Sequence, residues 1–133
     1  MLDRITGGFG VALASELFYY AEHMAGREHL GELEHLVLLA VLRLGEDAYG
    51  VPIRLEIERR AGRSLTVGAL YRTLDRLEAK GYVTSRFGDP TPERGGRSRR
   101  YFKMRSPGIQ ALRASREALA AMWKGVELVS RGS

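Results

Sequence analysis

The sequence predicts a mainly α-helical protein that carries one small β-hairpin and ends in a long helix. The first supporting observation is residues 31–44, a helix-length segment with seven consecutive apolar residues. The second is a pair of short alternating runs within residues 82–104, separated by a loop rich in glycine, proline and arginine. The third is Ser106-Pro107, which begins a segment of roughly twenty residues with helical apolar spacing.

Length and composition are those of an ordinary soluble protein. The 133 residues, 44% hydrophobic and 28% charged, suffice for one domain with a modest core. The absence of cysteine excludes disulfides, thiolate metal sites and a cysteine nucleophile. No apolar run approaches the roughly 18 residues of a membrane span. We therefore expect a cytoplasmic protein with no membrane partner.

The excess positive charge is concentrated in one segment. Residues 86–105 hold seven lysine and arginine residues against two acidic ones, which accounts for the whole formal net charge of +5. A local cationic patch of this kind indicates a polyanionic partner such as nucleic acid. The alternative is a solvated hairpin loop that only keeps the protein soluble.

These patterns divide the chain into three parts. Residues 1–29 are an N-terminal extension, residues 30–105 a compact domain, and residues 106–133 a C-terminal helical segment. Within the extension, residues 11–24 could form an amphipathic helix, yet His23-Met24 is also what a common cloning junction leaves. An integral extra helix and an added segment both stay open.

The compact domain begins with two helices. Residues 31–44 are apolar over too much of their surface for a single stripe, so this helix is buried on more than one side. In so small a chain the second side is expected to meet another subunit, with Leu36 and Leu39 as candidates. Residues 45–47 end this helix, and a second helix extends from about residue 49 to residue 60.

A third, short helix is predicted after residue 66. Leu70, Leu74 and Leu77 follow i, i+4, i+7 spacing and form one apolar stripe. Thr66 can cap the start of the helix, and Gly81 lies where a helix end favours a positive φ. The other faces carry small or polar residues, which are Gly68, Tyr71, Arg72, Asp75 and Arg76.

Two strands, residues 82–87 and 100–104, complete the compact domain around the basic loop. The order of helix, helix, turn, helix, strand, basic loop and strand is that of a winged helix-turn-helix DNA-binding domain. In this arrangement the third helix would enter a major groove of double-stranded DNA. The loop, or wing, would lie on phosphate or in the adjacent minor groove.

Several stretches together resemble the PadR-type transcriptional regulators, a winged-helix family with a C-terminal dimerisation helix. The resemblance extends from residue 30 to about residue 126 and includes Ala48-Tyr49-Gly50 and the stretches VGALYRTL (67–74), RLEAKGYV (76–83) and GGRSRRYF (95–102). One departure is Met104-Arg105, where the family usually has a Leu-Thr pair. We expect Ser106 to take over the capping of the following helix.

The candidate DNA contacts lie on the third helix and the wing. Arg72 and Arg76 can bind guanine bidentately or clamp phosphate. The small residues Gly68 and Ala69 would let the positive end of the helix approach DNA closely. The full set of predicted DNA-binding residues is Ser64, Thr66, Gly68, Ala69, Tyr71, Arg72, Arg76, Arg94, Arg97 and Arg99.

These assignments have an alternative within the domain. Tyr71 could donate to phosphate or stack near a sugar, but it could equally pack inside the domain. Arg72 or Arg76 could likewise pair with Asp75 or Glu78 rather than with DNA.

The C-terminal helix is expected to pair with the same helix of a second subunit. Its apolar residues fall close to heptad spacing, and a helix this long has too little of its own domain to cover it. The alternative is a helix that folds back on its own domain. The predicted dimer interface consists of Leu36, Leu39, Leu112, Leu119, Met122, Trp123 and Val126.

The family resemblance also implies an effector, because some members bind planar aromatic or drug-like molecules between these helices. The candidate effector-binding residues are Val37, Leu119, Met122 and Trp123. For Trp123, a plain packing role is the alternative.

The sequence does not predict an enzyme. His23, His29 and His35 are spaced by six residues, which does not align them on one helix face. With Glu32 and Glu34 they could form only a weak mixed metal site, so we expect neither a metal nor another cofactor. We therefore predict a homodimeric, sequence-specific regulator of transcription. A repressor that an effector releases from DNA is the preferred form of this prediction. The alternative is a winged-helix module that contacts proteins.

Overall fold

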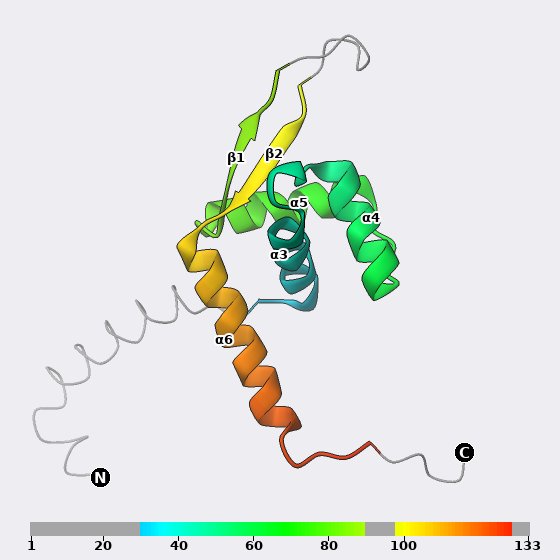
Figure 1. Cartoon of the computed structure of the whole chain (residues 1–133), viewed down its shortest axis with the longest axis vertical. Coiled ribbons are helices and arrows are strands. Elements are labelled where there is room, and N and C mark those ends of the chain that lie inside the picture. Colours follow the sequence, from blue (N-terminus) through cyan, green and yellow to red (C-terminus); the bar gives the residue numbers. More distant parts are fainter. Residues whose placement is uncertain (1–29, 90–97, 129–133) are drawn as a thin grey trace, which may run out of the picture.

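The computed structural model describes residues 30–89 and 98–128, and Figure 1 shows how their elements are arranged. The predicted N-terminal helix and the wing residues Arg94 and Arg97 lie outside these ranges. The elements, in chain order, are α3 (Glu32–Leu44), the short 3-10 helix η1 (Gly45–Asp47), α4 (Gly50–Ala61), α5 (Val67–Ala79), β1 (Val83–Phe87), β2 (Arg100–Met104) and α6 (Ser106–Trp123).

Helix α3 lies at the centre of the domain. It packs against α4, α5, β2 and α6, which explains why the sequence is apolar on more than one of its sides. Leu38 of α3, Ile53 of α4 and Leu74 of α5 are fully buried in the core that these helices enclose. The second apolar side of α3, which was expected to meet another subunit, is therefore partly covered by other elements of the same chain. Leu36 stays half-buried and Leu39 is exposed.

The structure confirms the predicted start, apolar stripe and end of helix α5. The Thr66 hydroxyl accepts a hydrogen bond from the Ala69 amide at 3.0 Å, which satisfies one of the free amides of the first turn. Leu70, Leu74 and Leu77 are all fully buried. Gly81 has φ of +81°, a conformation that glycine adopts without strain, and the chain turns there into β1.

Strands β1 and β2 form an antiparallel hairpin in which Val83 pairs with Met104 and Phe87 with Arg100. A third, single-residue strand joins it, because Tyr49 forms a bridge with Tyr101 and the Phe102 amide donates to the Ala48 carbonyl at 2.8 Å. The sequence did not predict this bridge, which attaches the residue before α4 to strand β2.

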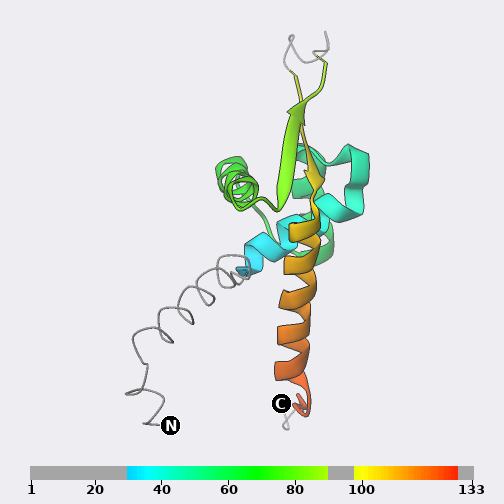
Figure 2. The same ribbon diagram turned by 90° about the vertical axis from the view of Figure 1, so that its left-hand side faces the viewer.

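Helix α6 begins directly after β2 and then leaves the body of the domain (Figures 1 and 2). The predicted Ser106 cap is wrong. Ser106 is the first helical residue, and the extended Arg105 precedes it without a side-chain cap. The register is set by the backbone instead, since the Arg105 amide donates to the Tyr82 carbonyl at 3.0 Å and the Arg105 carbonyl accepts from Gly108 at 2.9 Å.

The first turns of α6 are anchored closely on the hairpin. Gly108, Ala111 and Leu112 are buried, whereas every described residue from 116 onward is exposed. A Cβ added to Gly108 would lie 2.4 Å from the Tyr82 carbonyl oxygen, a backbone atom that cannot move aside. Only glycine permits this approach, and it fixes the direction in which α6 leaves the domain.

Replacing Gly108 with alanine should therefore destabilise the protein by about 1–3 kcal/mol, the usual cost of forcing an extra methyl group into a packed site. Urea denaturation followed by circular dichroism would measure this difference. The control is Gln110→Ala, since Gln110 lies exposed in the same part of α6. Equal stability of the two variants would show that the close contact at Gly108 has no energetic importance.

Candidate nucleic-acid interface

One face of α5 is directed outward along the whole helix. Gly68, Arg72, Asp75 and Ala79 recur at i, i+4, i+7 and i+11, and all four are exposed. Figure 2 shows α5, in bright green, projecting from the body on one side of the hairpin. A helix held by one apolar stripe, with the opposite face outward, has the form that a major groove accepts.

Arg72 lies back along this outer face toward the start of α5. Its Nη1 atom is 3.3 Å from the position that a Cβ on Gly68 would occupy. The guanidinium therefore lies over Gly68, in the direction that helical side chains normally lean. Arg72 is exposed, so its donors face solvent at the N-terminal end of the helix.

Arg76 has a different role, because it binds a buried carboxylate. Its Nε atom donates to Glu34 Oε2 at 3.1 Å, and Lys80 Nζ donates to the same oxygen at 3.0 Å. The Gly31 amide donates to Glu34 Oε1 at 2.9 Å. The sequence considered Asp75 and Glu78 as the alternative partners of Arg76, but the partner is a residue of α3, 42 positions earlier.

The electrostatics of Glu34 depend on these partners. Burial alone would raise the pKa of this carboxyl, but the Gly31 amide and the cations of Lys80 and Arg76 outweigh burial and hold the pKa below its ordinary value of 4.5. Glu34 is therefore a charged strut that joins the start of α3 to the end of α5.

Tyr71 packs at the junction of α4, α5 and the hairpin. Its ring centroid lies 6.5 Å from that of Phe102, and a Cβ added to Gly50 would lie 2.5 Å from the Tyr71 hydroxyl. Tyr71 stays half-buried. This is the packing position that the sequence offered as the alternative to a DNA contact.

The turn before α5 is held by polar contacts from α4. Arg54 Nε donates to the Leu65 carbonyl at 3.0 Å, and the Ser64 hydroxyl donates weakly to Glu58 at 3.4 Å. Thr66 is occupied by its cap and Ala69 is half-buried. Of the predicted DNA contacts near the helix start, Gly68 is the one that lies open on the outer face.

The hairpin is joined to α5 through Arg100. Its Nη2 donates to Glu78 at 2.7 Å, its Nη1 pairs with Asp75 at 3.0 Å, and its Nε donates to the Ser85 hydroxyl at 3.3 Å. These contacts set the position of the wing strands relative to α5. Arg100 therefore positions the hairpin relative to α5, a role that was not predicted from the sequence.

Arg99, a predicted wing contact, lies at the wing end of the hairpin, where its carbonyl accepts a hydrogen bond from the Gly88 amide. Its guanidinium carbon is 4.4 Å from the centre of the Tyr49 ring, and Arg86 lies over Tyr101 at 4.8 Å. The two tyrosine rings meet edge to face at 5.4 Å. This stack of cations and rings orients the two strands that lead into the wing.

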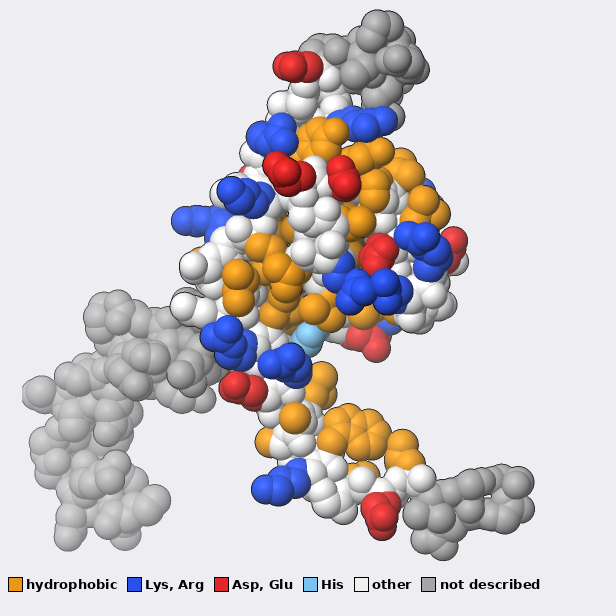
Figure 3. All heavy atoms as spheres, in the orientation of Figure 1, with side chains coloured by type: hydrophobic (Ala, Val, Ile, Leu, Met, Phe, Trp, Pro, Cys, Tyr) orange, Lys and Arg blue, Asp and Glu red, His pale blue; other side chains and the backbone are white. Residues whose placement is uncertain are grey.

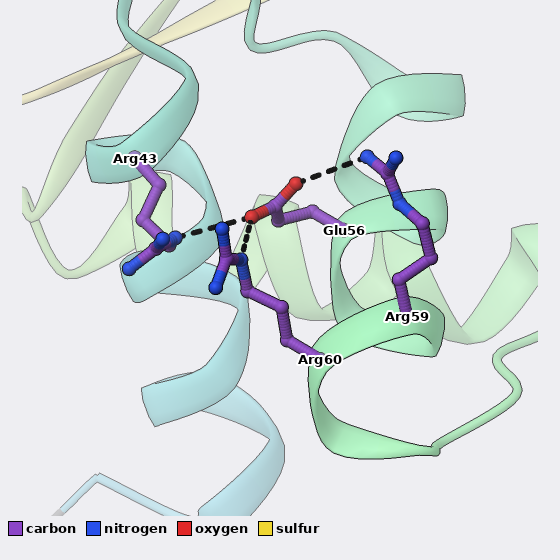
Figure 4. A network of polar contacts seen from close by, with 4 residues as sticks. All are labelled: Arg43, Glu56, Arg59 and Arg60. Atoms are coloured by element: carbon purple, nitrogen blue, oxygen red, sulfur yellow. Dashed lines mark hydrogen bonds and ion pairs between the residues drawn. The ribbon is translucent and has the colours of Figure 1, made fainter.

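A second buried carboxylate joins α3 to α4 (Figure 4). Glu56 accepts from Arg43 of α3 at 3.1 Å and from Arg59 and Arg60 of α4. The hydrogen bond from Arg60, with help from Arg43 and Arg59, holds the pKa of Glu56 below its ordinary value in spite of partial burial. Arg43 thus links α3 to α4, while Arg59 and Arg60 bind Glu56 within α4.

A groove of about 530 Å³ lies between α3 and α6. Across it, His35 Nδ1 and the Ser115 hydroxyl are 2.9 Å apart, and burial lowers the pKa of His35. Of the predicted effector contacts, only Leu119 lines this groove. Met122 and Trp123 do not line it, and Val37 is fully buried in the core. The lining residues are Leu30, Glu32, His35, Leu36, Leu39, Ser115, Ala118 and Leu119.

Large apolar side chains are exposed along the second half of α6 (Figure 3). Leu119 is 56% exposed, Met122 77%, Trp123 53% and Val126 52%, whereas Leu112 is buried in the core of its own domain. Leu119, Met122 and Trp123 therefore lie on one exposed stretch of α6, whereas Val126 lies beyond the helix, which ends at Trp123.

Within residues 30–89 and 98–128, no group of histidine and acidic residues has the arrangement of a metal site. In the same described ranges, no helix is both long and apolar enough to span a membrane.

These observations define a winged-helix protein of the kind that binds DNA. The sequence matches the transcriptional regulator PadR-like family over residues 38–114, and the chain belongs to that family. No curated protein is similar to the sequence by direct comparison.

Several solved structures share the fold. A PadR family transcription regulator from Clostridium difficile R20291 is 22% identical with a TM-score of 0.59, covering 71% of this chain and 93% of that one. A PadR family regulator from Eggerthella lenta DSM 2243 is 20% identical with a TM-score of 0.56, covering 88% and 90%. Bacillus subtilis PadR, solved in complex with operator DNA, is 19% identical with a TM-score of 0.53, covering 76% and 52%.

The strut at Glu34 gives a prediction for stability and its pH dependence. Glu34→Gln should lower the free energy of unfolding at pH 7 by about 1–3 kcal/mol, because a buried charge-assisted network is lost. The folded state lowers the pKa of Glu34, so its contribution is fully present above the ordinary value of 4.5. It is lost as the pH falls through the lower folded-state pKa.

The variant should accordingly lose less stability than the wild type as the pH falls below about 4.5. Urea titrations at several pH values would measure both effects. Glu32→Gln is the matched control, since the Glu32 side chain is 77% exposed and pairs only at the surface with Arg63. An acid profile that is identical in wild type and Glu34→Gln would contradict the role of the strut.

Proposed function

We propose that this PadR-family protein is a homodimeric repressor that binds an inverted-repeat operator and is released by a small molecule bound between its subunits. The observation that carries the DNA-binding part is the outward face of α5, which presents Gly68 and Arg72 beside the two strands that lead into a cationic wing. A dimer covering both half-sites would exclude other proteins from that DNA, which is the physical basis of repression.

In this proposal, residues of α5 and residues of the wing make different contacts with the DNA. Arg72 supplies a bidentate donor to a base edge or a phosphate, and the exposed amide end of α5 around Gly68 approaches the backbone. Arg94, Arg97 and Arg99 supply charge from the wing. Tyr71, Arg76 and Ser64 act mainly through the intramolecular contacts that position α5.

The exposed stretch of α6 supports the proposed dimer. Leu119, Met122 and Trp123 expose more than half of their surface to water. Pairing this stretch with its copy around a two-fold axis would bury it, as helices do in a coiled coil. Two-fold symmetry would then place the two α5 helices about one turn of DNA apart or somewhat more.

The groove between α3 and α6 supports the proposed effector site. Its volume of about 530 Å³ falls in the range of small-molecule sites, and Leu36, Leu39 and Leu119 make its wall apolar. A ligand there would contact both the domain and the dimer helix. It would therefore favour one separation of the two subunits over another, and shift the equilibrium between them.

The DNA-binding proposal is tested by a fluorescence-anisotropy titration at two salt concentrations. The probe is duplex DNA from upstream of the protein's own operon, and a shuffled duplex is the control. We expect tighter binding to the native duplex and a steep fall of affinity with salt. Equal and weak binding to both duplexes would leave only a non-specific electrostatic patch.

The wing can be tested with the double variant Arg97→Ala, Arg99→Ala. Removing these cations should weaken binding to native and shuffled duplexes alike, because phosphate contacts carry no sequence information. In a dimer, the slope of log affinity against log salt should flatten by about 2–4. Salt titrations measure the slope, and an unchanged slope would contradict the wing assignment.

The dimer can be tested with Met122→Glu. A charge at this 77% exposed position would have to be buried in the pairing of two α6 helices, so we expect the variant to dissociate into monomers. Sedimentation equilibrium measures the mass. Gln110→Glu, on the first turns of the same helix, should stay dimeric; a dimeric Met122→Glu variant would place the interface elsewhere.

The effector site can be tested through Trp123, the only tryptophan of the chain, which lies one helical turn beyond the groove residue Leu119. Titration with a panel of planar aromatic compounds should quench or shift its fluorescence and weaken operator binding. Unchanged fluorescence throughout the panel would argue against an aromatic effector at this place. A compound that binds there at saturation without changing operator affinity would exclude the release mechanism for that compound.

A further inference from the structure

Strand β1 ends in a large aromatic side chain that is exposed to water. Phe87 is 69% exposed, more than any other aromatic residue in the described part of the chain. It is also not among the residues that form or flank the core. An aromatic ring carries a large apolar surface, and covering that surface is favourable. The position of Phe87 on the hairpin indicates what could cover it.

Phe87 lies on the side of the hairpin that faces α5. Paired residues of an antiparallel hairpin lie on one face, and so do residues two apart along a strand. Phe87 pairs with Arg100 and is two positions from Ser85. The Ser85 hydroxyl donates to Glu78 of α5 at 2.9 Å. Arg100 also reaches α5, where it binds Glu78 at 2.7 Å and Asp75 at 3.0 Å.

The side chains of Asp75, Glu78, Phe87 and Arg100 therefore mark the corner between α5 and the hairpin, which we call the inner corner. Each nitrogen of the Arg100 guanidinium has a partner there, namely Ser85, Glu78 or Asp75. Its single positive charge faces two carboxylates, and the Asp75 side chain is 62% exposed. A phosphate placed at this corner would meet more negative than positive charge, so the corner offers it little attraction.

The geometry of a duplex determines which part of the DNA reaches the inner corner. The major groove and the adjacent minor groove are separated by one sugar-phosphate strand. With α5 in the major groove and the wing at the minor groove, this strand passes between them. Figure 2 shows α5 on one side of the hairpin, which continues past the helix toward the wing. The strand alternates charged phosphates with deoxyribose rings, and these rings provide its apolar surface.

We propose that Phe87 packs against a deoxyribose ring of the strand that separates the two grooves. The assignment rests on the proposed DNA-binding function and adds a contact of another kind to it. Arg72 and the arginines of the wing attract phosphates, and salt weakens that attraction. An apolar contact with a sugar releases no counterion. Phe87 thereby contributes affinity that depends neither on salt nor on the identity of the base.

Hydroxyl-radical footprinting tests this contact, because the radicals cleave DNA by attacking the hydrogens of deoxyribose. The tightest duplex is first selected from a random library with the full-length protein. Footprints at saturating protein and anisotropy titrations at several salt concentrations then compare the wild type, Phe87→Ala and Leu42→Ala. Leu42 is the matched control, because it is an apolar residue that is 47% exposed. It lines a groove beside Thr84 and Lys103, on the other face of the hairpin.

We expect Phe87→Ala to restore cleavage at one or two neighbouring sugars in each half-site and to leave the rest of the footprint unchanged. Its affinity should fall about tenfold, the effect of losing part of an apolar ring contact in each subunit. The slope of log affinity against log salt should equal that of the wild type, because no cation is lost. Leu42→Ala should match the wild type in all three measurements.

Other outcomes would overturn the sugar contact and leave the regulator itself intact. One is a Phe87→Ala variant with the affinity and footprint of the wild type, and another is a loss of protection over the whole half-site. A third is a sharp kink in the wild-type complex that the variant lacks, since a ring inserted between bases kinks the duplex. Circular-permutation gels measure the kink. A selection that enriches no sequence would instead contradict the proposed function, and the assignment would fall with it.

Discussion

The buried charge of Glu34 is the interaction on which the rest of the interface depends. It lies at the start of α3 and binds Arg76 and Lys80 at the end of α5. The N-terminal end of α3 is therefore held to the C-terminal end of α5. A buried carboxylate of this kind is tolerated only when its partners stay in place. The network therefore fixes the direction of α5, and Arg76 takes part in it with a side chain that is 53% exposed.

A single short region links α5, the wing and the dimer helix. The chain turns at Gly81, and the Tyr82 carbonyl then binds the Arg105 amide and lies against Gly108 at the start of α6. Arg100 joins the hairpin to α5 a few residues away. Because these contacts are close and involve backbone, a change in the direction of α6 would be transmitted to α5. The proposed release by an effector would use this connection.

Periodicity and local chemistry predicted the helices and the hairpin well. Leu70, Leu74 and Leu77 identified the buried side of α5, and Thr66 and Gly81 identified its two ends, because these signals depend on neighbours within a few residues. The pairing of Arg76 with Glu34 and the Tyr49–Tyr101 bridge could not be predicted, since they join residues 42 and 52 positions apart. The start of α6 was misjudged for the same reason: a backbone contact with Tyr82, rather than a side-chain cap, sets it.

The central claim is that the outer face of α5 enters the DNA in two copies related by symmetry. The chain has no cysteine, so Ala79→Cys on this face would carry a single tethered DNA-cleaving iron chelate. We predict two symmetric clusters of cuts in the selected operator, about one helical turn or somewhat more apart. Arg59→Cys, at one of the arginines that bind Glu56 on α4, should give no cuts. Cleavage from residue 59 but not from residue 79 would contradict this account.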